Sequence, residues 1–100
     1  MTTLSPQQRK TLTRLAHHLD PLVIVGKQGV TDNLVSAVEE NLEAHELIKI
    51  RFNDFKGEKR PLAEAIAGRT GSEVADIIGH VAILYRQQRN PEKRKIDLSA

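Results

Sequence analysis

Apolar residues recur along this chain at two different spacings, and each change of spacing marks the boundary between two predicted elements. Some segments have apolar residues three or four positions apart, which is the spacing of an amphipathic helix. Shorter segments are either apolar throughout or alternate between apolar and polar residues, which is typical of strands. In chain order we predict a helix at 5–19, a strand at 22–25, a helix at 31–44, a strand at 47–52, a helix at 59–69, and strands at 74–78 and 81–86.

The ends of the predicted helices carry residues that start or stop a helix. Ser5 can cap the first helix, Pro6 suits its first position, and Gln8 stands where a capping box needs its partner. Pro61 is tolerable only in the first turn of the third helix, and Gly71 can end that helix. These local signals support the predicted boundaries.

The first two predicted strands differ in how their side chains alternate. Residues 22–25 are all apolar, so we predict that both faces of this strand are buried, as in a parallel sheet. Residues 47–52 alternate, with three apolar side chains on one face and Lys49 and Arg51, together with Leu47, on the other. This strand therefore places two cations on the face opposite its core residues.

The order of the elements, α-β-α-β-α-β-β, predicts one α/β domain with two layers and a four-stranded mixed sheet. Right-handed crossovers make the first three strands parallel neighbours or near neighbours. Gly79 and His80 fit a two-residue hairpin, so the last strand is antiparallel to the one before it. We place the domain at residues 1–89, and residues 90–100 form a basic C-terminal extension.

The composition limits the chain to one small domain in a reducing compartment. With 100 residues, of which 39% are hydrophobic, it can bury a single core. It has no cysteine, which excludes disulfides and thiolate metal sites. Residues 1–6 lack the features of an export signal, and no apolar run approaches the roughly 18 residues of a membrane span. We therefore expect a cytoplasmic protein, and we also expect a monomer.

The sequence lacks the common catalytic and metal-binding patterns. The four histidines, His17, His18, His45 and His80, do not pair with each other or with carboxylates at the spacing of a helical metal site. A nucleophile elbow, a Walker lysine-serine pair and an HExxH motif are also missing. We expect no enzymatic activity, no cofactor and no bound metal.

The string Gly26-Lys27-Gln28-Gly29 lies between the strand at 22–25 and the helix that begins near Thr31. Glycine lets a backbone approach a phosphate closely, a helix N-terminus presents free N–H groups, and the lysine adds a positive charge. This context favours an anion-binding corner. The alternative is a plain strand-to-helix turn, because GxxG strings are common. A second such string, Gly68–Gly71, ends a helix, and we interpret it as structural.

The charge is distributed unevenly, although the net charge is only +2 and the sequence pI is about 9.2. The first helix has a basic side without an acid and an apolar side, which we predict to consist of Leu12, Leu15, Ala16 and Leu19. Only three residues are aromatic, so a nucleic acid would be bound through its phosphates and not by stacking. Beyond the loop, the candidate phosphate contacts are Lys10, Arg14, Lys49, Arg51 and Arg86. Arg86, at the end of the last strand, could instead pair with an acid.

Several ordered strings in this chain resemble the CRM domain, a family named after chloroplast RNA splicing and ribosome maturation. The strings are residues 23–31, His45-Glu46-Leu47-Ile48-Lys49, Gly71, Ile78-Gly79 and Leu84-Tyr85-Arg86. The resemblance to stand-alone bacterial YhbY-type proteins covers about residues 4–96. It implies a fold similar to the C-terminal domain of translation initiation factor three. It also implies RNA binding, with Gly26, Lys27, Gln28 and Gly29 likened to the loop of KH domains, and association with precursors of the large ribosomal subunit.

Two functions remain open at this point. The first is a ribosome-assembly factor that binds ribosomal RNA through the loop and the basic faces. The second is a protein-interaction adaptor whose acidic second helix, with Glu39, Glu40 and Glu43, docks a basic partner. Salt-sensitive RNA affinity distinguishes them, because only RNA binding releases condensed counterions. We favour RNA.

Overall fold

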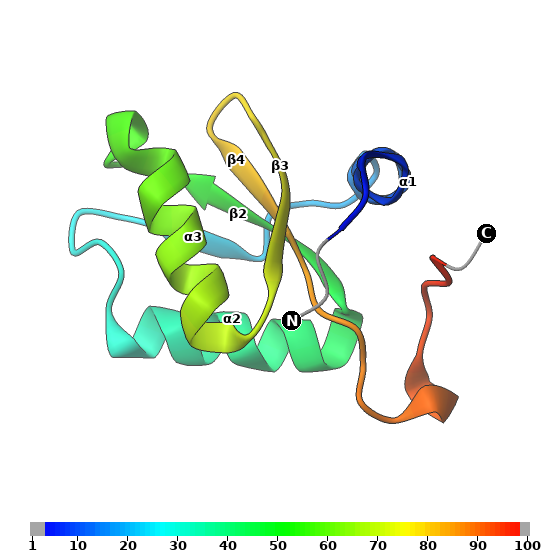
Figure 1. The fold of residues 1–100 in the computed structure, drawn as a ribbon. Helices are drawn as coiled ribbons and strands as arrows, with labels where there is room; N and C mark the ends of the chain where they lie inside the picture. Colours follow the sequence, from blue (N-terminus) through cyan, green and yellow to red (C-terminus); the bar gives the residue numbers. More distant parts are fainter. Residues whose placement is uncertain (1–3, 99–100) are drawn as a thin grey trace.

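The predicted order of helices and strands is confirmed. The computed structural model describes residues 4–98, in which three helices surround a four-stranded sheet (Figure 1). The helices are α1 (Pro6–Ala16), α2 (Asp32–His45) and α3 (Lys59–Thr70). The strands are β1 (Val23–Val25), β2 (Leu47–Phe52), β3 (Glu73–Ile78) and β4 (Val81–Tyr85). Short 3-10 turns lie at Lys56–Glu58 and Pro91–Lys93.

The sheet is mixed, as predicted, and its strand order is β1-β2-β4-β3. β1 runs parallel to β2, so that Val23 lies beside Ile50 and Ile24 beside Arg51. β4 lies between β2 and β3 and is antiparallel to both. β3 therefore runs parallel to β2 without being its direct neighbour.

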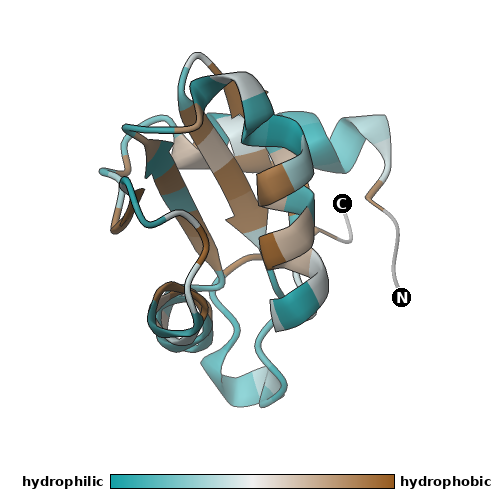
Figure 2. Ribbon diagram, turned by 90° about the vertical axis from the view of Figure 1, so that its left-hand side faces the viewer, coloured by the Kyte–Doolittle hydropathy of each residue, from teal (hydrophilic) through white to brown (hydrophobic). Residues whose placement is uncertain are grey.

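Helices cover both faces of the sheet, which differs from the two layers that the sequence predicts. α2 and α3 pack on one face, over a core that includes Leu42 and Ile66 (Figure 1). α1 packs on the opposite face, where Leu12 and Ala16 are buried. The second cover is needed because β4, in the interior of the sheet, is buried and apolar on both faces. In Figure 2 the apolar colour accordingly concentrates in the strands, and the connecting loops are mostly hydrophilic.

The predicted caps at Ser5 and Gly71 are confirmed, and Thr31 is a further cap that the sequence did not single out. Ser5 Oγ accepts a hydrogen bond from the backbone N–H of Gln8 (3.1 Å), and Gln8 Oε1 accepts one from the N–H of Ser5 (2.9 Å). Thr31 caps α2 in a similar way, since its Oγ1 accepts a hydrogen bond from the N–H of Leu34 (3.1 Å). Gly71 ends α3 in the left-handed conformation, with φ of 66°. These caps depend on neighbouring residues alone, so the sequence predicts them well.

α1 is shorter than predicted and buries fewer side chains. It ends at Ala16 and not at Leu19. After Ala16 the backbone tightens into turns, in which the N–H of His17 donates to the carbonyl oxygen of Arg14 (3.2 Å) and the N–H of Leu19 to that of Ala16 (3.0 Å). Of the four residues on the predicted apolar side, Leu12 and Ala16 are buried, whereas Leu15 and Leu19 are 43% and 39% exposed.

The prediction that the first strand is buried on both faces is also wrong. Val23 and Val25 are buried, but Ile24 is 54% exposed and Leu22, just before the strand, is 50% exposed. β1 lies at the edge of the sheet, and α1 packs mainly against β2, β3 and β4. The face of β1 that carries Ile24 therefore stays open, next to Arg51 of β2.

The C-terminal segment folds back onto the domain. Glu46, only 1% exposed, receives hydrogen bonds at its carboxylate from the backbone N–H groups of Gln88 (2.9 Å), Lys95 (2.5 Å) and Ile96 (3.3 Å). Ile96 and Leu98 pack against the core on the α1 side. The predicted boundary near residue 90 stays a prediction, but the basic extension after it lies against the sheet face and is held there by a buried carboxylate.

Candidate functional site

The glycine-flanked string between β1 and α2 forms a tight turn. The N–H of Gly29 donates a hydrogen bond to the carbonyl oxygen of Gly26 (3.0 Å), which closes four residues into one loop. Gly29 has φ of 71°, in the left-handed region that side chains other than glycine rarely adopt. Two residues later Thr31 caps α2. The turn therefore projects Lys27 and Gln28 just before a helix N-terminus.

The tip of this loop is available to a ligand. Lys27 and Gln28 are exposed, and within residues 4–98 neither side chain is engaged in a hydrogen bond or an ion pair. The loop lines a shallow hollow together with Ile24, Thr31 and Asn33. The first turn of α2 adds N–H groups that have no partners within the helix. The loop thus combines a free cation, free backbone donors and the positive end of a helix.

The first glycine of the loop is not required by the fold. A Cβ atom built on Gly26 meets no atom within 4 Å, and its φ lies outside the left-handed region. Close approach of a ligand to the backbone is a physical reason for glycine at such an open position. Gly29 differs, because its positive φ itself requires glycine.

One acid lies close to the start of α2. Asp32 is in the first turn of the helix, where a negative charge competes with a bound anion. Its carboxylate accepts a hydrogen bond from Arg69 Nη2 of α3 (2.8 Å). The pairing offsets part of the negative charge beside the loop.

The two predicted cations of β2 differ in their availability. Arg51 is exposed and lies beside Ile24, two residues before the loop, on the open face of β1. Lys49 is half-buried, and its Nζ donates a hydrogen bond to the carbonyl oxygen of Leu19 (3.0 Å). Arg51 can therefore extend the surface of the loop more readily than Lys49.

Two lysines that sequence reasoning missed, Lys56 and Lys59, lie at the end of the sheet where β2 ends. Lys59 Nζ donates a hydrogen bond to the carbonyl oxygen of Gly79 and lies 3.3 Å from His80 Nδ1. The pKa of His80 is lowered by partial desolvation and by the positive charges of Lys59, Lys56 and Arg51. Because the N–H of Phe52 donates to the carbonyl oxygen of His80, this cluster sits where β2 ends and the β3–β4 hairpin turns. Only the folded chain brings these cations together, so no local pattern indicates them.

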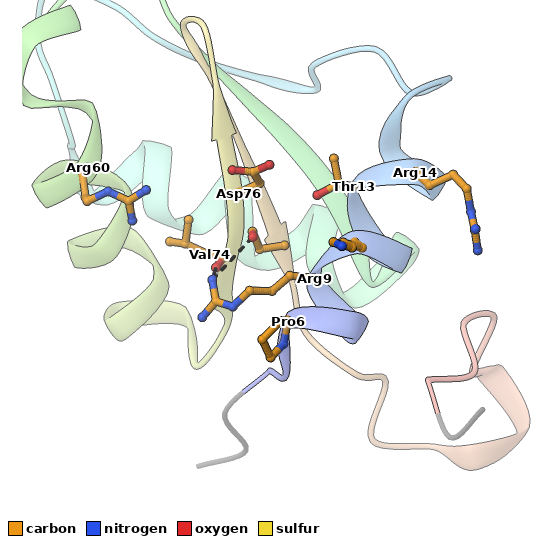
Figure 3. Close-up of a pocket in the computed structure, with 9 residues that line it drawn as sticks. Pro6, Arg9, Thr13, Arg14, Arg60, Val74 and Asp76 are labelled. Atoms are coloured by element: carbon orange, nitrogen blue, oxygen red, sulfur yellow. Dashed lines mark hydrogen bonds between the residues drawn. The ribbon is translucent and has the colours of Figure 1, made fainter.

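Lys10 and Arg14 belong to a different basic region. They line a hollow of about 500 Å³ between α1 and β3, together with Arg9, Arg60 and Asp76. Figure 3 shows Arg9 reaching from α1 to β3, where its Nη1 donates a hydrogen bond to the carbonyl oxygen of Val74 (3.0 Å). Arg60 approaches β3 from the side of α3, and Arg14 extends away from the strand (Figure 3). The structure thus separates the α1 cations from the loop, and it adds two arginines that the sequence did not single out.

Arg86 is not an available phosphate contact. Its side chain is only 11% exposed and binds both Glu39 (2.7 Å) and Glu43 (2.9 Å) of α2. It also donates a hydrogen bond to the carbonyl oxygen of Thr70 (2.9 Å). The sequence-based assignment of Arg86 to the ligand-binding surface is therefore withdrawn. The same ion pairs neutralise Glu39 and Glu43, two of the three glutamates that the adaptor hypothesis needs for a basic partner. Of the three, Glu40 alone is exposed and unpaired within residues 4–98.

Within residues 4–98, no three or more histidines and carboxylates are arranged to hold a metal ion. None of the helices in that range has both the length and the apolar character that crossing a membrane requires.

Comparison with known proteins places this chain in a family. Residues 4–86 match the model of the CRS1 / YhbY (CRM) domain. A Haemophilus influenzae protein named "RNA-binding protein" is 39% identical over 99 residues, covering 98% of this chain and 97% of its own. The Bacillus subtilis "Probable RNA-binding protein YqeI" is 36% identical and covers 95% and 98%.

A solved structure agrees with this assignment. The solution structure of the hypothetical protein SAV1595 from Staphylococcus aureus has a TM-score of 0.78 and 32% identity, with coverage of 95% of this chain and 100% of that one. The predicted mixed α/β fold is thereby supported by an experimental structure. The chain belongs to the CRS1 / YhbY (CRM) domain family.

Proposed function

We propose that this protein binds RNA and that its Gly26–Gly29 loop holds a phosphate of the RNA backbone. The observation that carries the proposal is the exposed loop itself, where an unpaired Lys27 precedes the N-terminus of α2. The names of the relatives from Haemophilus influenzae and Bacillus subtilis support RNA as the ligand. Membership of the CRM family supports it as well.

In this proposal the loop and the nearby cations make different contacts with the RNA. Backbone N–H groups at the start of α2 donate hydrogen bonds to phosphate oxygens. Gly26 lets the RNA approach the protein backbone without a side chain in between. Lys27 contributes a mobile positive charge. Arg51 continues the contact along the open face of β1, and Lys56 and Lys59 add charge at the end of β2.

The cations on α1 form a second region for phosphates. Lys10 and Arg14 are exposed, and Lys49 is half-buried on the face of β2 against which α1 packs. Together with the loop, these three cations can make four to six contacts with RNA phosphates. Such contacts carry no base identity, so we propose an interface that recognises the RNA backbone and its shape.

We further propose that the RNA is ribosomal and belongs to precursors of the large ribosomal subunit. The monomeric protein would then act in the cytoplasm as a ribosome-assembly factor. This part rests on the resemblance to the CRM family, since phosphate contacts cannot select one RNA over another. The adaptor hypothesis loses support because Arg86 already occupies Glu39 and Glu43.

The decisive experiment changes the first glycine of the loop. Gly26→Val should leave the fold intact, because the site is open, and should place a side chain between the backbone and a phosphate. Gly68→Val is the matched control, since Gly68 begins the second GxxG string and is equally open. Gly26 is a better position for this substitution than Gly29. Because Gly29 has a positive φ, a side chain there would strain the backbone, and the strain could not be told apart from a loss of binding.

The readout is the fluorescence anisotropy of a labelled fragment of ribosomal RNA, with thermal unfolding of each variant as a check of the fold. Gly26→Val should weaken binding at least about fivefold, equivalent to one lost hydrogen bond of roughly 1 kcal/mol. Gly68→Val should bind like the unmodified protein. Equal affinity of both variants would show that the loop does not hold the RNA.

A further inference from the structure

One exposed aromatic side chain lies beside the loop. Of the three aromatic residues in the chain, Phe52 is fully buried and Tyr85 is 7% exposed, whereas Phe55 is 42% exposed. Phe55 lies in the short connection between β2 and α3, just before a 3-10 turn. Among the Phe, Tyr and Trp side chains of the described residues, Phe55 is therefore the one that a ligand could reach.

The ring of Phe55 packs over the last glycine of the loop. A Cβ atom built on Gly29 would lie 3.4 Å from Phe55 Cε2 and 3.7 Å from Cζ. The ring edge thus lies beside the space that a side chain at Gly29 would occupy, and Phe55 is partly open to solvent. A strand of RNA held by the loop would pass next to this ring.

The backbone at Phe55 is held in an unfavourable conformation. Its φ is 56° and its ψ 37°, a left-handed conformation that is uncommon for a bulky residue. The preceding residues are fixed to the end of β1, because the N–H groups of Asn53 (3.1 Å) and Asp54 (3.3 Å) both donate to the carbonyl oxygen of Val25. The carbonyl oxygen of Phe55 accepts a hydrogen bond from the N–H of Glu58 (3.0 Å). These bonds hold the ring beside the loop and preorganise it for a ligand.

We propose that Phe55 stacks on a nucleobase of the RNA strand whose phosphate is held by the Gly26–Gly29 loop. The inference rests on the proposed function and adds a contact with a base to an interface otherwise made of phosphate contacts. A ring that is exposed, fixed in position and next to cations has the properties of a stacking platform for single-stranded RNA. Every base has a π-face, so this contact gives affinity without strong sequence preference.

The test separates stacking from charge by comparing two polyanions. Phe55→Leu keeps an apolar contact with Gly29 but removes the aromatic face. We expect it to weaken binding of an unstructured RNA dodecamer about tenfold, within the range measured for loss of one stacked base. Binding of inorganic polyphosphate of similar length should not change, because it has no bases. Lys27→Ala should weaken binding of both polyanions.

The outcomes distinguish this inference from the proposed function. If the unmodified protein binds the RNA and Phe55→Leu binds it equally well, stacking is refuted while RNA binding stands. If Phe55→Leu weakens RNA and polyphosphate to the same extent, the ring only supports the loop, and stacking is again refuted. If the unmodified protein does not bind the RNA at all, the proposed function itself fails.

A spectroscopic variant gives a second and independent result. The chain has no tryptophan, so Phe55→Trp creates a single fluorescent reporter at this position. Stacking on a base should quench its emission when RNA is added to saturation, and polyphosphate should leave the emission unchanged. Unchanged emission with saturating RNA would overturn the inference. This result decides the question even if Phe55→Leu fails to fold.

Discussion

Replacing Arg86 by alanine should destabilise the fold and leave the RNA affinity of the folded protein unchanged. The substitution removes three hydrogen bonds, to Glu39, to Glu43 and to the carbonyl oxygen of Thr70. Arg86 is 11% exposed, but the two glutamates are 46% and 56% exposed, so water can solvate them after the change. The loss is therefore smaller than for a fully buried ion pair, and about 1 kcal/mol for each bond gives about 3 kcal/mol in total.

Urea unfolding followed by circular dichroism measures this loss directly. For a domain of this size, about 3 kcal/mol corresponds to a decrease in Tm of roughly 12–24 °C. The matched control is Arg89→Ala, because Arg89 is exposed on the same segment, and such surface changes typically alter stability by less than about 0.5 kcal/mol. If Arg86→Ala unfolds like the unmodified protein but binds RNA more weakly, the ion-pair explanation is wrong and Arg86 contacts phosphate after all.

Two further predictions concern the fold near its ends. Glu46→Gln should lower the free energy of unfolding by about 2 kcal/mol, because an amide oxygen cannot replace a carboxylate that accepts three backbone N–H bonds. Hydrogen exchange at the backbone amides of Lys95 and Ile96 should accelerate in this variant. Unchanged exchange would contradict the role of Glu46 as an anchor. The pKa of His80 is lowered in the folded protein, so the folded state resists its protonation and stability should fall as pH decreases below about 6.5. His80→Gln should reduce this loss, seen as a smaller difference in Tm between pH 7.5 and pH 5.5, and an identical difference in both proteins would refute the assignment.

The features that the sequence predicted correctly depend on short stretches of chain. The capping box of Ser5 and Gln8, the left-handed Gly71 and the alternation of β2 each involve residues within one element. The order of elements, the hairpin at Gly79 and the mixed sheet follow when these locally predicted elements are taken in chain order. Local chemistry therefore sufficed for most of the fold.

The errors concern contacts between distant parts of the chain. The apolar pattern of α1 could not show that the helix docks away from β1, which leaves Ile24 and Leu15 exposed. Arg86 meets the glutamates of α2 across more than forty residues of sequence, and its partners become visible only in the fold. Lys56 and Lys59 escaped notice for the same reason, since their neighbour His80 comes from another strand connection.

The central claim is that RNA phosphates are bound by the loop and the basic surface. The most direct test is the dependence of RNA affinity on salt concentration, measured by anisotropy for the unmodified protein, for Lys27→Ala and for the exposed-site control Lys93→Ala. With four to six phosphates neutralised, log affinity should fall against log salt with a slope of roughly −3 to −5. Lys27→Ala should make the slope shallower by about 0.7–0.9, whereas Lys93→Ala should not change it. A slope near zero, or the same slope with and without Lys27, would contradict the account.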